Sequence, residues 1–218
     1  MDIELPISGE RVRPGKLVCV GRNYAKHAAE MRSEVLAEPM LFLKPSTALV
    51  PDGGEVVIPS MTNDVHHEVE LVVVVGRDTR SVSVEEAGEC IGGYALGLDM
   101  TARDLQSKAK KSGHPWSVAK GFDTFAPLGT IVAPDAVGEA SELTLELRVN
   151  GRLVQSGNTR DMIFSPAFLI HYASQIFTLE KGDLIYTGTP EGVGPVVAGD
   201  LLEATAIGLP SLTVTVAG

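Results

Sequence analysis

The chain has 218 residues, a formal net charge of −10 at pH 7 and a hydrophobic share of 44%. This length supports one large domain or two small ones, and the apolar share is sufficient for a buried core. The acidic balance argues against a general nucleic-acid or anionic-membrane binder, so we predict neither partner. No apolar run approaches the roughly 20 residues that a membrane-spanning helix needs.

The cysteines and the amino terminus bear on the compartment. Cys19 and Cys90 lie far apart in apolar runs, as buried free thiols do, which favours a reducing compartment. The first residues, Met1 to Pro6, carry acid where a signal or transit peptide carries base. We therefore predict a cytoplasmic protein.

Strands outnumber helices among the predicted elements, because Val-rich runs alternate with Gly- and Pro-rich turns. Residues 1–15 form a short amino-terminal lead-in, and residues 16–218 form a single domain. In chain order the predicted strands are 16–20, 40–44, 56–58, 68–75, 93–99, 118–120, 128–132, 143–149, 152–156, 183–187, 201–207 and 212–216. The predicted helices are 24–32, 84–90, 101–111 and 166–178. The pattern predicts an α+β fold that is mainly β.

Two acids open the most hydrophobic predicted strand. Glu68 and Glu70 precede the run Leu71–Val75, and residues two apart on a strand share a face. Two like charges so close raise each other's pKa unless a cation lies between them. Asp99, at the end of another predicted strand, supplies a third carboxylate, and hard divalent cations prefer such oxygens. The alternative is ordinary surface charge at a strand end, which the buried character of the run Leu71–Val75 disfavours.

A histidine and an acid lie three residues apart on the first predicted helix. His27 and Glu30 are neighbours at this spacing, and Asn23 is placed to cap the helix. A carboxylate beside an imidazole fixes its tautomer and raises its basicity, which suits a general base for water. An exposed amphipathic turn has the same spacing, and spacing alone favours that reading.

Residues 101–121 hold five basic side chains and one acid, a local excess in an acidic chain that could hold a small anion. We assign Lys108, Lys110 and Lys111 to a solvated helix face. Lys120 lies between apolar residues, and a half-buried lysine is more often functional.

The segment Thr187–Gly194 is rich in glycine and follows a predicted strand. No Gly-Lys-Ser/Thr follows it, so it is not a P-loop. Its backbone N–H groups and the Thr189 hydroxyl could still hold a carboxylate, although a plain turn uses the same residues. No Gly-x-Ser-x-Gly motif supports a serine hydrolase.

Several motifs in one order resemble the fumarylacetoacetate hydrolase family over nearly the whole chain from Lys16. They are Gly21-Arg22-Asn23-Tyr24 followed by His27, His67-Glu68-Val69-Glu70-Leu71, Leu98–Asp104, Pro115–Lys120 and Thr187–Gly194. Within the family the chain is most similar to the small acylpyruvases that also decarboxylate oxaloacetate. The pairing of Met100–Asp104 with Met162–Ser165 favours this group.

The resemblance implies a mixed β-sandwich roll of the family's C-terminal domain type, a homodimer and a bound Mg²⁺ or Mn²⁺. The implied metal ligands are Glu68, Glu70 and Asp99. The implied catalytic residues are His27 and Glu30, on a lid that orders over the substrate, and Lys120. The implied substrate-binding residues are Arg22, Tyr24, Arg103, Gln106 and Thr189.

The implied activity is metal-dependent hydrolysis of a C–C bond in acylpyruvates such as acetylpyruvate or fumarylpyruvate, through a metal-bound pyruvate enolate. Oxaloacetate decarboxylation passes through the same enolate without attack by water. The alternative is an isomerase of the 2-hydroxyhepta-2,4-diene-1,7-dioate type, and a third reading is a binding module without turnover. The substrate is a small 2-oxo acid in the hydrolase reading and a 2-hydroxy-dienoate in the isomerase reading. The loops 31–39 and 106–117 are expected to select the acyl group.

Overall fold

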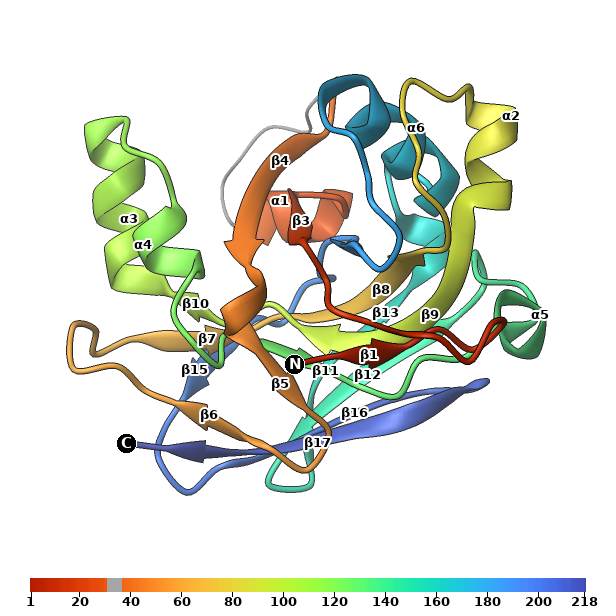
Figure 1. Cartoon of the computed structure of the whole chain (residues 1–218). Coiled ribbons are helices and arrows are strands. Elements are labelled where there is room, and N and C mark those ends of the chain that lie inside the picture. Colours follow the sequence, from red (N-terminus) through yellow and green to blue (C-terminus); the bar gives the residue numbers. More distant parts are fainter. Residues whose placement is uncertain (31–36) are drawn as a thin grey trace.

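The computed structural model describes residues 1–30 and 37–218, and strands dominate it (Figure 1). The largest sheet has seven strands in the order β4-β3-β14-β8-β9-β11-β5. Their bounds are Met40–Pro45, Lys16–Gly21, Leu184–Tyr186, Val69–Val75, Ile91–Leu98, Ala126–Leu128 and Leu49–Pro51. Parallel and antiparallel pairs both occur in this sheet. The predicted mainly β fold is confirmed.

A second sheet of five strands, in the order β13-β12-β16-β17-β6, packs against the first. Its strands are Arg152–Asn158, Thr144–Val149, Leu201–Ala206, Leu209–Ala217 and Glu55–Val57. Three short strands, β10 (Thr101–Ala102), β7 (Val65–His67) and β15 (Gly194–Val196), form a third sheet. The lead-in forms a hairpin of β1 (Ile3–Glu4) and β2 (Arg11–Val12).

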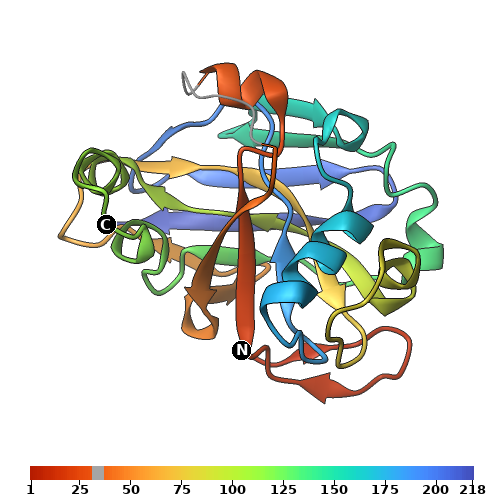
Figure 2. The ribbon, with the colours of Figure 1, turned by 90° about the horizontal axis from the view of Figure 1, so that it is seen from above.

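The helices α3 and α4 form one pair, and α2 and α6 form another. Figures 1 and 2 show α3 beside α4 at one end and α2 beside α6 at the other. The bounds are α1 Ala25–Glu30, α2 Val84–Ala87, α3 Arg103–Ser112, α4 Ser117–Lys120, α5 Pro134–Val137 and α6 Pro166–Ile176, with 3₁₀ turns at Ser46–Ala48, Gly88–Cys90 and Thr159–Asp161. None of the helices described is long and apolar enough to cross a bilayer.

Strand β8 is buried on both faces, which explains its unbroken hydrophobic run. Leu71 and Val73 belong to the core between the two large sheets, whereas Val72 and Val74 belong to a second core on the other face. Since strand side chains alternate, Glu70 shares its face with Val72 and Val74. Glu70, near the start of β8, therefore lies at one end of this second core.

Most predicted elements are present with boundaries shifted by one to three residues. The Asn150-Gly151 turn joins β12 to β13 as expected, with φ of 51° and 78° at its two residues. Ser83 caps α2 in a capping box. The predicted helix 24–32 is observed as Ala25–Glu30, and its predicted last residues lie outside the described part of the chain.

Three local predictions were wrong. Of the predicted strand 128–132 only Leu128 belongs to a strand, β11 (Ala126–Leu128). Residues 118–120 form helix α4 rather than a strand, because Lys120 N–H and Gly121 N–H donate to Trp116 and Ser117 carbonyls. Three residues are too few to show a periodicity, and one valine misled the assignment. Asn23 does not cap α1. Its side chain instead joins two distant segments, by donating to the carbonyls of Phe164 and Thr187.

Candidate metal centre

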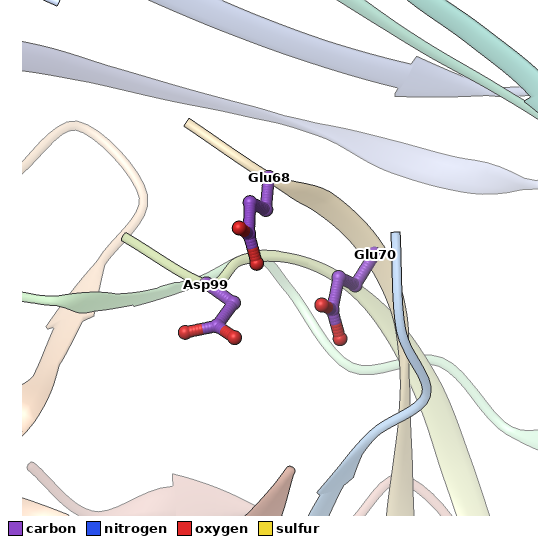
Figure 3. Close-up of side chains that lie close together, drawn as sticks. All are labelled: Glu68, Glu70 and Asp99. Atoms are coloured by element: carbon purple, nitrogen blue, oxygen red, sulfur yellow. The ribbon is translucent and has the colours of Figure 1, made fainter. Parts of the chain in front are cut away.

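Three carboxylates from two neighbouring strands meet at one point. Glu68 lies between β7 and β8, Glu70 lies on β8, and Asp99 follows β9, the antiparallel neighbour of β8. One oxygen from each lies within 4.8 Å of the others, and all three side chains are buried (Figure 3). The structure thus brings together the three residues predicted as metal ligands.

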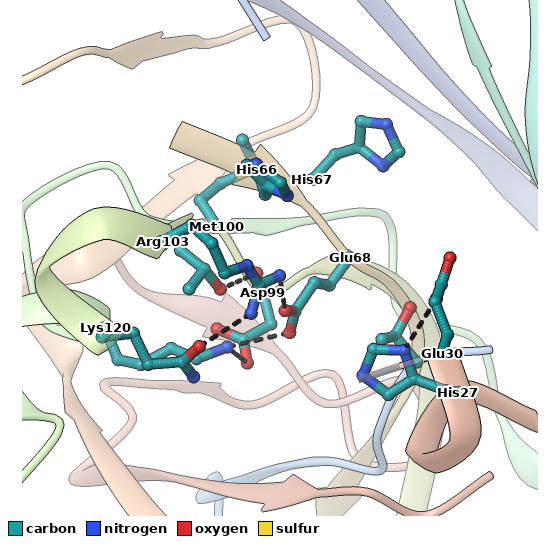
Figure 4. A network of polar contacts seen from close by, with 12 residues as sticks. His27, Glu30, His66, His67, Glu68, Asp99, Met100, Arg103 and Lys120 are labelled. Atoms are coloured by element: carbon teal, nitrogen blue, oxygen red, sulfur yellow. Dashed lines mark hydrogen bonds and ion pairs between the residues drawn. The ribbon is translucent and has the colours of Figure 1, made fainter. Parts of the chain in front are cut away.

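Three buried cations neutralise two of these acids. Figure 4 shows two of them, Arg103 and Lys120, beside Glu68 and Asp99. Lys120 Nζ donates to Glu68 Oε2 at 2.8 Å and to Asp99 Oδ2 at 2.6 Å. Arg103 donates to Glu68 Oε1, and Lys44 Nζ lies 2.5 Å from Asp99 Oδ1. Burial alone raises the pKa of Glu68, but Lys120 and then Arg103 outweigh it and hold that pKa well below its usual range.

Glu70 is different, since none of the described basic side chains pairs with it. Its Oε2 accepts one hydrogen bond, from the Gly188 N–H at 2.8 Å. Burial, and then the negative charges of Asp99 and Glu68, raise the pKa of Glu70 well above its usual value. A buried, negatively charged donor set with one uncompensated member fits a hard divalent cation, for which carboxylate oxygens are the preferred ligands.

The charge balance also bears on the ligand. Three carboxylates face three cations, so a divalent ion among them leaves an excess of two positive charges. Such a centre attracts an anionic, oxygen-rich molecule.

Lys44 was missed by the sequence analysis. It is 1% exposed, and its Nζ also donates to the carbonyls of Met100 at 2.9 Å and Phe125 at 2.5 Å. A lysine near the end of the apolar strand Met40–Pro45 could have been identified by the reasoning applied to Lys120. Lys120 itself proves to be fully buried rather than half-buried.

The predicted histidine–carboxylate pair is formed. His27 Nδ1 lies 3.3 Å from Glu30 Oε2, and the Gly192 N–H lies 3.2 Å from each Glu30 oxygen. His27 is 6% exposed, and burial outweighs Glu68 and Glu30 to lower its pKa below the ordinary histidine value. The imidazole is therefore neutral at pH 7 and able to accept a proton.

One pocket contains both groups. It is lined by Val20, Gly21, Arg22, His27, Phe42, Glu68, Glu70, Asp99, Arg103, Gln106, Lys110, Trp116, Lys120 and Thr189. Four of the five predicted substrate-binding residues are in this lining. Tyr24 is not; it is 2% exposed, and its hydroxyl has no partner among the described residues.

Lys110 is exposed, as the sequence predicts for it together with Lys108 and Lys111. The sequence did not show that Lys110 also lines the pocket, with its Nζ 5.1 Å from the Trp116 ring centroid. Burial, and then the charges of Arg103 and Arg22, lower the pKa of Lys110 to about 8. Lys108 and Lys111 are exposed, as predicted. Segment 106–117 thus lines the pocket, whereas residues 31–36 of the other predicted loop lie outside the described part.

The glycine-rich segment Thr187–Gly194 serves both halves of the site. Gly188 donates to Glu70 and Gly192 donates to Glu30, so its N–H groups do hold carboxylates, but those of the protein itself. Both glycines have positive φ, 95° and 93°, and a Cβ on Gly188 would lie 2.7 Å from Asn23 Cβ. A residue with a side chain is strained at either position.

The family model for the fumarylacetoacetate (FAA) hydrolase C-terminal domain matches residues 16–217. The chain belongs to this family of enzymes, as its motifs indicated. It is 52% identical over 197 residues to the human protein named oxaloacetate tautomerase FAHD1, mitochondrial, and the match covers 90% of this chain and 89% of the relative.

Solved structures in the family have the same fold. Fumarylpyruvate hydrolase from Pseudomonas aeruginosa, in complex with Mn²⁺ and pyruvate, superimposes with a TM-score of 0.94 at 38% identity and covers 100% of this chain and 95% of its own. The 2-hydroxyhepta-2,4-diene-1,7-dioate isomerase from Mycobacterium marinum gives 0.84 at 38% identity, with coverages of 94% and 75%. The expected family fold is confirmed.

The state of Glu70 predicts opposite effects of one substitution with and without metal. Glu70→Gln keeps an acceptor for Gly188 but removes one of three repelling charges. Without divalent cations the variant should unfold about 2–4 °C above the wild type, as a relief of about 1 kcal/mol implies for this chain length. With Mn²⁺ the wild type should become the more stable protein, because the variant loses a ligand.

Thermal unfolding with EDTA or with Mn²⁺ measures both effects. Glu85→Gln, an exposed acid on α2, is the matched control and should shift neither midpoint. Equal stabilisation of Glu70→Gln and the wild type by Mn²⁺ would remove Glu70 from the metal site.

Proposed function

We propose that this protein is a metal-dependent acylpyruvate hydrolase that cleaves the C–C bond between an acyl group and a pyruvate unit. The observation that carries the proposal is the shared pocket: a neutral His27, paired with Glu30, faces the same space as the three carboxylates. A base for water and a site for developing negative charge are the two parts that this reaction requires.

The carboxylates are proposed to hold Mg²⁺ or Mn²⁺, with Glu68, Glu70 and Asp99 as ligands. The bound ion supplies Lewis-acid stabilisation for the 2-oxo acid end of the substrate. The enolate of pyruvate carries two negative charges, one on the carboxylate and one on the enolate oxygen. These balance the two positive charges that the ion adds to the ion-paired cluster of acids and cations, so stabilisation is greatest once the bond has broken.

The chain's own residues supply the remaining steps. His27 accepts a proton from the water that attacks the acyl carbonyl, while Glu30 orients the imidazole and stabilises its protonated form. Lys120 has three ammonium protons, and Glu68 and Asp99 accept two of them, so one is available for a substrate oxygen. Arg103, which is tied to Gln106 at 2.8 Å, lies beside them on the pocket wall.

A second candidate is interconversion or decarboxylation of oxaloacetate, which the 52% identity to an oxaloacetate tautomerase favours. Decarboxylation passes through the pyruvate enolate, and interconversion of the keto and enol forms passes through the enolate of oxaloacetate itself; neither adds water. The isomerase alternative uses the dienolate of its own substrate, with no carbon bond broken, and is favoured by the Mycobacterium marinum structure. A homodimer, a cytoplasmic location and the absence of nucleic-acid or membrane partners stay predictions.

Replacing His27 should separate hydrolysis from decarboxylation. His27→Ala removes the base, so acetylpyruvate hydrolysis should fall by about 10²–10⁴-fold, the usual contribution of general base catalysis. Oxaloacetate decarboxylation should fall by less than about 10-fold, because it needs no activated water. Loss of acetylpyruvate absorbance and release of CO₂ measure the two rates with Mn²⁺ present.

Wild-type protein assayed beside this variant tests the function itself. Turnover of a 2-hydroxy-dienedioate but of no acylpyruvate would replace the proposal with the isomerase alternative. Equal losses of both activities in His27→Ala would refute the assigned role of His27.

Lys110 predicts a preference for substrates with a second carboxylate. Among the described residues, neither Lys110 nor Arg22 pairs with an acid, and both line the pocket. Lys110→Met should lower kcat/KM for fumarylpyruvate by about 3- to 10-fold, as loss of a partly exposed ion pair implies, and leave acetylpyruvate nearly unaffected. The control Lys108→Met, on the exposed face of the same helix, should change neither rate. Equal effects on both substrates would exclude a subsite for the distal carboxylate.

A further inference from the structure

Gln155, on β13, makes four hydrogen bonds, one of them to Thr189 of the pocket lining. Its Oε1 accepts from the Val69 N–H at 3.0 Å and lies 2.9 Å from His67 Nδ1. Its Nε2 donates to the Pro190 carbonyl at 3.0 Å and to Thr189 Oγ1 at 2.9 Å. Gln155 is 1% exposed, so water does not replace these partners.

The backbone partners determine which atom of the Gln155 side-chain amide is the oxygen and which is the nitrogen. An N–H can only donate and a carbonyl oxygen can only accept. The atom facing Val69 must therefore be the amide oxygen, and the atom facing Pro190 must be the nitrogen. The same oxygen requires His67 to carry its proton on Nδ1. No ambiguity between the oxygen and the nitrogen of the amide remains.

This orientation determines what the Thr189 hydroxyl can do. Because Gln155 Nε2 already donates to Thr189 Oγ1, the hydroxyl proton must point elsewhere. None of the described residues accepts it, and Thr189 lines the pocket. The hydroxyl thus presents a hydrogen-bond donor to whatever occupies the pocket, close to Glu70, which the adjacent Gly188 N–H holds.

We propose that Gln155 is a positioning residue that forces the Thr189 hydroxyl to donate into the pocket, so that this wall selects an anionic oxygen of the ligand. The inference rests on the proposed function in taking that ligand to be a 2-oxo acid. Gln155 contacts no reacting atom, and acts through Thr189. Gly157 lies two residues along the same face of β13. Because it has no side chain, Pro190 can pack against it, which helps to hold the segment Thr187–Gly194 in place.

Exchanging the amide for a carboxylate tests the proposal. Gln155→Glu keeps the size of the side chain and an oxygen for Val69 and His67, but places an acceptor opposite Thr189. The hydroxyl should then turn its proton towards the introduced carboxylate and stop donating to the ligand. Losing a hydrogen bond to a charged group should weaken pyruvate binding by about 10- to 100-fold.

The experiment titrates pyruvate calorimetrically into Mn²⁺-loaded wild type, Gln155→Glu, Thr189→Val and the double variant. Gln155→Glu and Thr189→Val should each lose affinity for pyruvate. The double variant should lose no more than Thr189→Val alone, because both changes remove the same hydrogen bond, from the Thr189 hydroxyl to the ligand. Thr189→Ser keeps the hydroxyl and should bind within about 3-fold of the wild type. Gln175→Glu, an exposed Gln-to-Glu change on α6, is the matched control and should bind as the wild type does.

The outcomes distinguish the proposal from a structural role. If Gln155 merely supported the fold, the losses of pyruvate affinity in Gln155→Glu and Thr189→Val would multiply in the double variant, and that result would overturn the inference. Wild-type affinity in a folded Gln155→Glu variant would overturn it as well. A wild type that binds Mn²⁺ but no pyruvate would overturn both the proposed function and this inference. Pyruvate binding with multiplying effects would overturn the inference alone.

Discussion

The repulsion among three buried carboxylates is the constraint on which the rest of the site depends. Glu68 and Glu70 share a face because they lie two apart at the start of β8, and antiparallel pairing with β9 adds Asp99. Lys120 and its basic neighbours relieve the first and last of these acids, whereas Glu70 has only a backbone N–H as a partner within residues 1–30 and 37–218. An acid left in this state inside a protein is costly, and a divalent ion removes the cost.

The glycine-rich segment links the metal centre to the base and to the substrate wall. Gly188 holds a proposed metal ligand, Thr189 faces the pocket, and Gly192 holds the partner of His27. Three functions thus depend on five consecutive positions of one backbone segment. Its conformation requires glycine at two of them, and Gln155 fixes the segment from the adjacent sheet. A change in this segment would alter metal, base and substrate together.

The sequence predicted those parts of the site that follow from periodicity within one element. Glu68 and Glu70 were found from the two-residue repeat of a strand. Helical spacing made His27 and Glu30 neighbours, but it favoured an exposed turn, and the family resemblance gave the pair its catalytic role. Lys44 and Gln155 were not found, because each reaches the site from a strand distant in sequence and shows no local pattern. Lys110 is exposed as predicted, but its place in the pocket lining was missed, since helical spacing alone does not tell which turn faces a pocket built by other segments. The short helix Ser117–Lys120 was missed because its four residues span one turn.

Anomalous diffraction from crystals of the protein soaked with Mn²⁺ tests the central claim most directly. The account predicts one strong manganese peak in the pocket, with an oxygen of Glu68, Glu70 and Asp99 each within about 2.5 Å, and no such peak in Glu70→Gln crystals soaked in the same way. A wild-type map with no manganese among these three side chains, at a concentration of Mn²⁺ that fills sites elsewhere, would contradict it.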